Sequence, residues 1–246
     1  MANVFEYAKI FQQELDRQVV AQATSGWMEA NAGLVKYNGG NEVKIPKIDM
    51  DGLGDYDRAK GFVEGSVTLE YETKTMTQDR GRTFMLDRMD VDESNFVATA
   101  ANVMGEFQRL HVIPEIDVYR YSSIASQAIP MGAARGGYNP DPADVLSEIK
   151  KDIAEIYDVA GEIPLVITVS MPVWAIMSNS TEIMKVLSVI DFTRGDVKTK
   201  VRGIDENPII PVPSARMKTE YQFFDGKTPG QEQGGFQPTV DAKNIN

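Results

Sequence analysis

The chain of 246 residues contains no cysteine and only one histidine. Without cysteine it has no disulfide bonds, no thiolate nucleophile and no cysteine-ligated zinc, a composition typical of proteins made in a reducing cytosol. The single histidine, His111, excludes the common metal sites that use several histidines. It is also the only candidate base for a Ser-His-Asp constellation. Its position next to Leu110, on an apolar helical stripe, favours a structural role.

Long apolar runs are also missing. The longest apolar stretch, residues 163–177, is interrupted by Pro164 and Pro172 and is too short to cross a bilayer. The N-terminal residues 1–18 lack the basic segment and apolar core of a secretory signal. The sequence therefore predicts no membrane association.

Positive charge is scarce, with 25 Lys and Arg against 36 Asp and Glu and a net charge of −11. Such a chain is poorly suited to gripping nucleic acid, because that affinity depends on neutralising phosphates. Hydrophobic residues make up 42% and charged residues 25% of the chain, as in ordinary globular proteins. The length allows one large core or two modest domains.

The most informative segment is residues 83–124, which predicts a long amphipathic helix. Apolar residues recur at the helical period; they are Phe96, Val97, Ala100, Val103, Met104, Phe107 and Leu110. Asp90, Asp92 and Glu93 precede them, where negative charge suits a helix N-terminus. A helix over 92–112 would be roughly 30 Å long. Pro114 is expected to bend or end it, with a second short helix following.

Residues 38–82 predict an extended hairpin. Val43 and Ile45 alternate with polar residues before an Asp- and Gly-rich tip over 49–65, and alternation returns with Val67, Leu69 and Tyr71. Two half-polar strands around a polar tip bury little surface, so such a hairpin is marginal in isolation. We therefore expect it to lie on another surface.

The rest of the chain predicts alternating helices and strands. The clearest helix spans 141–160, with Asp141 as its cap, Pro142 at its first position and Gly161 after its end. The other expected elements are a helix over 3–23, a buried strand over 163–170, short helices opening at Pro172 and Thr181, a strand over 198–204, a proline-punctuated edge or loop over 207–217, and a loop over 223–246.

Three motifs in this order carry a family resemblance. They are FMLDRMDVDESN before the long helix, PEIDVYRYSSI after it, and the later VRGIDENPIIPVPSARMKT. With the preceding hairpin, they resemble the major capsid protein of tailed bacteriophages with the Hong Kong 97 type fold. The resemblance implies an α+β fold with a peripheral domain built on a long spine helix, an axial domain, an extended loop and an N-terminal arm.

The resemblance also suggests how the chain is divided. It implies an N-terminal arm over 1–37, an extended loop over 38–82, a peripheral domain over 83–131, and an axial domain with a C-terminal loop over 132–246. The helix at 3–23 packs on its own domain or lies on a neighbouring subunit, and both remain open. Related capsid chains continue with a closing strand, so we expect this chain to be truncated before it.

By the same resemblance, the chain is a structural virion protein and not an enzyme, and it uses no cofactor. Copies made in the bacterial host cytoplasm would form pentamers and hexamers of an icosahedral head. The head would enclose double-stranded DNA without sequence-specific binding. The implied partners are other copies of the chain, a portal and a separate scaffolding protein. The expected contacts between subunits are Arg58, Lys60, Phe62, Arg82, Asp87, Glu115 and Arg120.

Other functions remain open from the sequence. An encapsulin-type bacterial compartment would share the fold. The acids at 49–57 or 87–93 could belong to a metal-dependent or hydrolytic enzyme, although 49–57 lacks the spacing and closing Glu of a calcium loop. Solvated acids in the first cluster and helix N-terminal acids in the second explain them more simply. The hairpin could also pair with a partner strand.

Overall fold

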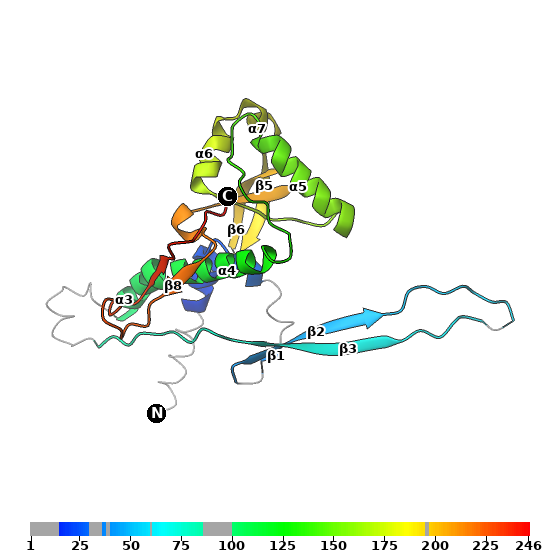
Figure 1. Cartoon of the computed structure of the whole chain (residues 1–246), viewed down its shortest axis with the longest axis horizontal. Coiled ribbons are helices and arrows are strands. Elements are labelled where there is room, and N and C mark those ends of the chain that lie inside the picture. Colours follow the sequence, from blue (N-terminus) through cyan, green and yellow to red (C-terminus); the bar gives the residue numbers. More distant parts are fainter. Residues whose placement is uncertain (1–14, 30–35, 38–39, 60, 86–99, 195–196) are drawn as a thin grey trace. The chain divides into compact units, whose positions relative to one another are not determined.

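The computed structural model describes residues 15–29, 36–37, 40–59, 61–85, 100–194 and 197–246. The chain is a mixed α+β protein, and these residues form three small sheets (Figure 1). It divides into two compact units, Met28–Arg88 and a second unit that joins Met1–Trp27 to Met89–Asn246. The helix expected over 3–23 is described only in its C-terminal part, where residues 15–22 are helical.

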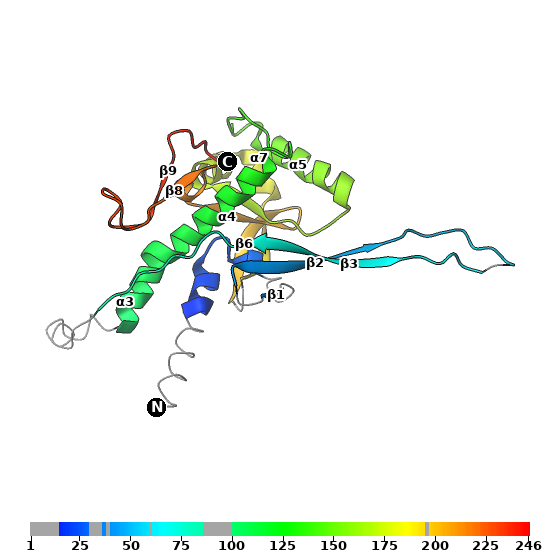
Figure 2. The same cartoon turned by 60° about the horizontal axis from the view of Figure 1, so that its bottom comes forward.

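The unit Met28–Arg88 contains the predicted hairpin. Strands β2 (Glu42–Met50) and β3 (Val67–Thr75) pair antiparallel along their whole length, and β1 (Lys36–Tyr37) pairs with β2 (Figures 1 and 2). The alternation of apolar and polar residues therefore predicted both long strands correctly. The predicted tip was wrong at its start, because Asp49 and Met50 still belong to β2, where they pair with Thr68 and Val67.

In the other unit, one helical run continues through Pro114. It consists of α3 (Ala100–Phe107), the π-helical turn η2 (Gln108–Val112) and α4 (Ile113–Ala128), about 43 Å in total. Of the two outcomes expected at Pro114, a bend or an end, the end is therefore excluded, and a π-helical turn lies directly before the proline. In the π turn the N–H of Ile113 donates to the carbonyl of Gln108, five residues back. This wider turn accommodates a proline that has no N–H to donate and whose ring needs space.

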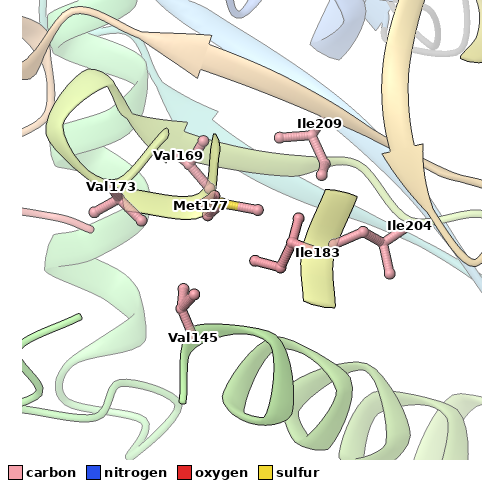
Figure 3. Close-up of a cluster of buried hydrophobic side chains, with 7 residues drawn as sticks. All are labelled: Val145, Val169, Val173, Met177, Ile183, Ile204 and Ile209. Atoms are coloured by element: carbon pink, nitrogen blue, oxygen red, sulfur yellow. The ribbon is translucent and has the colours of Figure 1, made fainter. Parts of the chain in front are cut away.

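The next elements along the chain form a mixed sheet of order β4-β7-β6-β5 and the helices that pack with it. They are α5 (Val145–Ala160), β4 (Ile167–Ser170), α6 (Met171–Asn179), α7 (Thr181–Val186), β5 (Ser188–Arg194), β6 (Val197–Ile204) and β7 (Asn207–Val212). The core joins side chains from α5, β4, α6, α7, β6 and β7 (Figure 3); its buried members are Val145, Val169, Val173, Met177, Ile183, Ile204 and Ile209. The predicted helix begins at Val145 instead of Asp141, and the predicted strand at Ile167 instead of Ile163.

Strand β7 corrects the expectation of an edge or loop over 207–217. It is almost entirely buried and lies between β4 and β6. Its partner changes along its length: Pro208 pairs antiparallel with Gly203 of β6, whereas Pro211 pairs parallel with Val169 of β4. Each proline therefore has one neighbouring strand instead of two, which tolerates a residue without an N–H.

The C-terminal residues also differ from the predicted loop. After the short helix η3 (Ser214–Arg216), strands β8 (Tyr221–Phe223) and β9 (Phe236–Pro238) pair antiparallel. Their rings pack together, with Tyr221 and Phe236 at 5.7 Å between centroids, and Phe223 lies 6.1 Å from Tyr119 of α4. Aromatic packing therefore orders a segment that is rich in Gly and Gln.

Candidate functional site

One face of the β2–β3 hairpin is apolar and uncovered within its own unit. The side chains of the cross-strand pairs Ile48–Leu69 and Met50–Val67 lie on the same side of the hairpin. This follows because cross-strand partners share a side and every second residue of a strand points the same way. Pro46 and its partner Tyr71 extend the row. Ile48 is 63% exposed and Leu69 54% exposed. We call these six residues (Pro46, Ile48, Met50, Val67, Leu69 and Tyr71) the apolar hairpin face.

The opposite face of the same hairpin is polar at residues 47–49 of β2, whereas Val43 and Ile45 lie on it further from the tip, opposite Lys74 and Glu72. Lys47 pairs with Glu70, and Asp49 with Thr68. Glu72 forms an ion pair with Lys74, which lowers the pKa of the Glu72 carboxyl through a hydrogen bond and through charge. Over residues 46–50 of β2 the two faces thus differ in chemistry, as expected when one side of a ribbon meets protein and the other meets water.

The hairpin continues beyond its strands towards a narrow tip. Asp51 and Ser66 face each other: the Ser66 N–H and hydroxyl donate to the Asp51 carboxylate over 2.7 and 2.8 Å, which lowers the pKa of Asp51. Further out, Asp57 and Gly61 exchange two backbone hydrogen bonds. The Phe62 ring lies 4.9 Å from the Tyr56 ring, yet Phe62 is 82% exposed. The tip is therefore ordered by its own contacts and presents an aromatic side chain outward.

The residues expected to join subunits have different surroundings. Arg58, Phe62 and Arg82 are exposed on the unit Met28–Arg88. Glu115 and Arg120 are half-buried on α4. The Arg120 guanidinium donates to the carbonyl and hydroxyl oxygens of Ser25 over 3.1 and 3.2 Å, so it binds its own chain. Lys60 and Asp87 lie outside the described residues.

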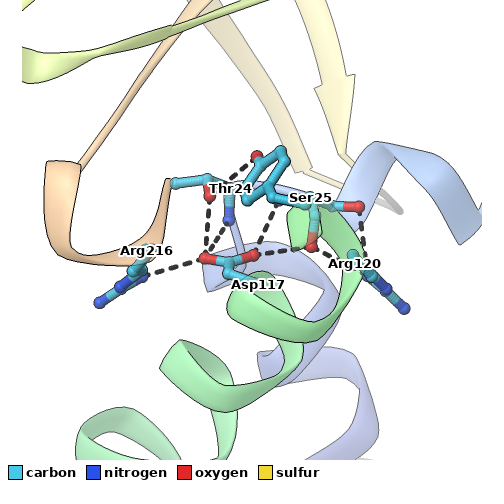
Figure 4. Close-up of polar contacts among 6 residues, drawn as sticks. Thr24, Ser25, Asp117, Arg120 and Arg216 are labelled. Carbon is cyan, nitrogen blue, oxygen red and sulfur yellow. Dashed lines mark hydrogen bonds and ion pairs between the residues drawn. The ribbon is translucent and has the colours of Figure 1, made fainter. Parts of the chain in front are cut away.

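A buried carboxylate on α4 organises the second cluster, which we call the Asp117 clasp (Figure 4). Asp117 is fully buried. Its Oδ1 accepts hydrogen bonds from the N–H and hydroxyl of Ser25 over 3.0 and 2.6 Å. Its Oδ2 accepts from the N–H and hydroxyl of Thr24 over 3.2 and 2.8 Å, and from the Arg216 guanidinium over 3.0 Å. These bonds satisfy a charge that would otherwise be costly to bury.

The clasp joins three segments that are far apart in the sequence. Thr24 and Ser25 follow the N-terminal helix, Asp117 lies on α4, and Arg216 lies on η3. Next to them Gly26 approaches the backbone so closely that an added Cβ would lie 2.0 Å from the carbonyl oxygen of Val20. The segment around 24–26 is therefore fixed to α4 by hydrogen bonds and to the N-terminal helix by close packing.

Sequence reasoning missed the clasp. A signal was present in PEIDVYRY, because Asp117 occurs among the apolar positions Ile113, Val118 and Tyr121, all of which are buried. An acid at such a position must find donors inside the protein. Nothing in the sequence identifies those donors as Thr24, Ser25 and Arg216.

The candidates for metal or acid–base chemistry do not form a constellation in the described part of the chain. No group of three or more His, Asp or Glu side chains there is placed to hold a metal ion. His111 is exposed, with its ring 5.5 Å from that of Phe107. The cluster at 87–93 lies outside the described residues.

Comparisons with protein-family models, curated proteins and solved structures found no match. Among the described residues, no helix combines the length and the apolar character that crossing a membrane requires. The function must therefore be argued from the surfaces described above.

Proposed function

We propose that this chain is a structural subunit that assembles with copies of itself into a closed shell, the major capsid protein of a tailed bacteriophage. The apolar hairpin face carries this proposal. The family resemblance of the three sequence motifs supports it and suggests the kind of shell, an icosahedral head of pentamers and hexamers around double-stranded DNA.

Among the described residues of its own unit, the apolar hairpin face has no protein surface covering it. Five side chains of the apolar hairpin face are each more than half exposed, although burying such a side chain is worth about 1.5–3 kcal/mol; they are Ile48, Met50, Val67, Leu69 and Tyr71. Contiguous apolar surface of this kind marks an interaction site. A second copy is the occupant that a self-assembling subunit always has available.

The polar groups of the hairpin suit the same role. A charged opposite face keeps the ribbon hydrated while its apolar face is covered, and charge at the tip, such as Arg58, fixes register between partners. When each copy gives its hairpin to one neighbour and receives one from another, the contact is heterologous. Such contacts close into rings when the rotation between copies permits.

The chain's net charge of −11 fits a container that does not grip its contents. An acidic wall would let DNA slide past it during filling. Such sliding would depend on charge alone and would require no sequence-specific contact.

Electron microscopy of the purified protein by negative stain, together with light scattering, tests the proposal. We expect rings of five or six copies, or closed shells. A chain that stays monomeric with a scaffolding protein present would contradict the proposal. A cargo peptide bound inside purified shells would instead indicate the encapsulin-type compartment.

A pair of variants connects the outcome to the hairpin. Ile48→Thr with Leu69→Thr removes apolar surface from one cross-strand pair while keeping residues suited to strands. Lys47→Thr with Glu70→Thr makes the matched change on the polar face, again at one cross-strand pair. We expect the first double variant to lose assembly and the second to retain it. Equal assembly by both would show that the apolar hairpin face is not the contact.

A further inference from the structure

The β5–β6 hairpin has an exposed basic face in an otherwise acidic chain. Lys198, Lys200 and Arg202 alternate along β6, so they lie on the same side of the ribbon. Their cross-strand partners on β5 are Thr193, Asp191 and Val189. Three cations and one carboxylate leave this face with a net charge of +2. We call these six residues the basic face.

Among the residues that the structure describes, the cations of the basic face have no ionic partner. Lys198, Lys200 and Arg202 are exposed, and in the part of the chain that the structure describes none of them forms an ion pair. In the described residues, strand β6 pairs with β7 only through Gly203 and Ile204, so the ribbon from 197 to 202 extends beyond this pairing as two strands. Two-stranded ribbons gain stability from a covering surface.

The same unit carries a surface of opposite charge and similar length on α5. Glu148, Asp152 and Glu155 lie on one side of this helix at spacings of four and three residues. The Arg135 guanidinium bridges all three carboxylates, at 3.2 Å from Glu148 and 3.0 Å from Asp152. Three carboxylates and one guanidinium leave a net charge of −2. We call these four residues the acidic stripe.

The two surfaces match in charge and in extent. From Lys198 to Arg202 the basic face runs about 13 Å along the strand. From Glu148 to Glu155 the acidic stripe runs about 10 Å along the helix. The acidic stripe is ordered by Arg135 and still exposed, since its side chains retain between 38% and 59% of their accessible surface.

We propose that the basic face of one copy binds the acidic stripe of α5 on a second copy. This inference rests on the proposed assembly function and names a contact that the β2–β3 hairpin does not supply. The contact is heterologous, because each copy offers one surface of each kind, and it orients neighbouring copies head to tail. DNA is the less suitable occupant, because Asp191 lies in the middle of the basic face and the chain as a whole carries a net charge of −11.

Charge exchange tests the contact. The first variant carries Lys198→Glu, Lys200→Glu and Arg202→Glu. The second carries Arg135→Glu, Glu148→Lys, Asp152→Lys and Glu155→Lys, which keeps the pairing inside the stripe with its signs reversed. We expect each variant to associate at least about tenfold more weakly than the wild type in sedimentation velocity at low salt. A chain with both sets of changes should regain association, because its surfaces are again complementary.

A cross-linking measurement tests the contact independently of shell formation. The chain has no cysteine, so a Lys200→Cys chain mixed with an Asp152→Cys chain can join only at the introduced thiols. We expect mixed disulfides to form about tenfold faster than with the exposed control Ser126→Cys in place of Asp152→Cys. Both single-cysteine chains must first show the wild-type unfolding midpoint.

The outcomes separate this contact from the assembly function. Shells from the wild type and from both charge variants, with no preferred mixed disulfide, would overturn the contact and leave the shell function standing. Preferred mixed disulfides without rings or shells would support the contact and contradict a closed shell. Unchanged association of the first variant together with loss of DNA binding would also overturn the proposal and assign the basic face to nucleic acid.

Discussion

Ser25 and Asp117 lie 92 residues apart in the sequence and are joined by two hydrogen bonds to one carboxylate oxygen. The backbone N–H of Ser25 donates over 3.0 Å and its hydroxyl over 2.6 Å. Both residues are fully buried. This pair fixes the segment after the N-terminal helix to the long helix.

Replacing Asp117 by Asn should destabilise the fold strongly. The amide has one acceptor oxygen in place of two, so it cannot serve Thr24, Ser25 and Arg216 together, and the guanidinium of Arg216 loses its countercharge. We expect the free energy of unfolding to fall by about 3 kcal/mol or more, measured by urea denaturation. Asp158→Asn makes the same change at an exposed position of α5 and serves as the control. Equal midpoints for the two variants would show that the clasp adds no stability.

Phe62→Ala and Arg82→Ala should affect assembly and not folding. Both side chains are exposed, so each substitution is expected to change the free energy of unfolding by no more than about 0.5 kcal/mol. Electron microscopy should show fewer or malformed shells from both. Val240→Ala, at a fully exposed apolar residue near the C-terminus, is the matched control. Normal particles from both hairpin variants would count heavily against the proposed contacts.

Glu206→Gly should stabilise the turn between β6 and β7. Asp205 and Glu206 form this two-residue turn with φ values of 48° and 66°, a conformation that favours Asn, Asp and Gly. The variant creates the Asp-Gly sequence typical of such turns and keeps the ion pair of Asp205 with Lys150. We expect a gain of up to about 1 kcal/mol in urea denaturation, because glycine carries no Cβ penalty at positive φ. A loss of stability would mean that the Glu206 side chain makes a larger contribution than the turn strain.

The turn at Asp225 should be sensitive to acid. Its carboxylate accepts hydrogen bonds from the N–H groups of Thr228 and Lys227 and from the Thr228 hydroxyl, which lower its pKa to about 2 from 3.8. Because the folded-state pKa lies below the unfolded value of 3.8, the stabilisation is fully present at pH values well above 3.8 and is lost as the pH falls towards the folded-state pKa of about 2.

An NMR titration of the Asp225 carboxyl carbon should therefore give a midpoint near 2. The difference in stability between the wild type and Asp225→Asn should be constant above about pH 5 and shrink as the pH falls below it. A midpoint near the ordinary value of 3.8 would show that the turn does not hold the carboxylate in its charged form.

Local sequence patterns predicted the elements whose physics is local. The alternation around Val43 and Leu69 predicted β2 and β3, and the helical period predicted most of α5 and the described part of the long helix up to residue 112. Helix ends and the position of Asp49 within β2 were less well predicted, because caps and strand lengths depend on partners that a local pattern does not include.

Of the candidate site, the sequence by itself determined that residues 38–82 form a hairpin whose strands alternate apolar and polar residues. It also determined that this hairpin has little core of its own. Only the tertiary structure decided the rest. The register of β2 against β3 put Ile48 opposite Leu69 and so gathered apolar side chains on one face. Folding brought Thr24, Ser25 and Arg216 to Asp117, and gave β7 two different neighbours that accommodate Pro208 and Pro211. These outcomes depend on contacts between distant segments, whose energies no local periodicity encodes.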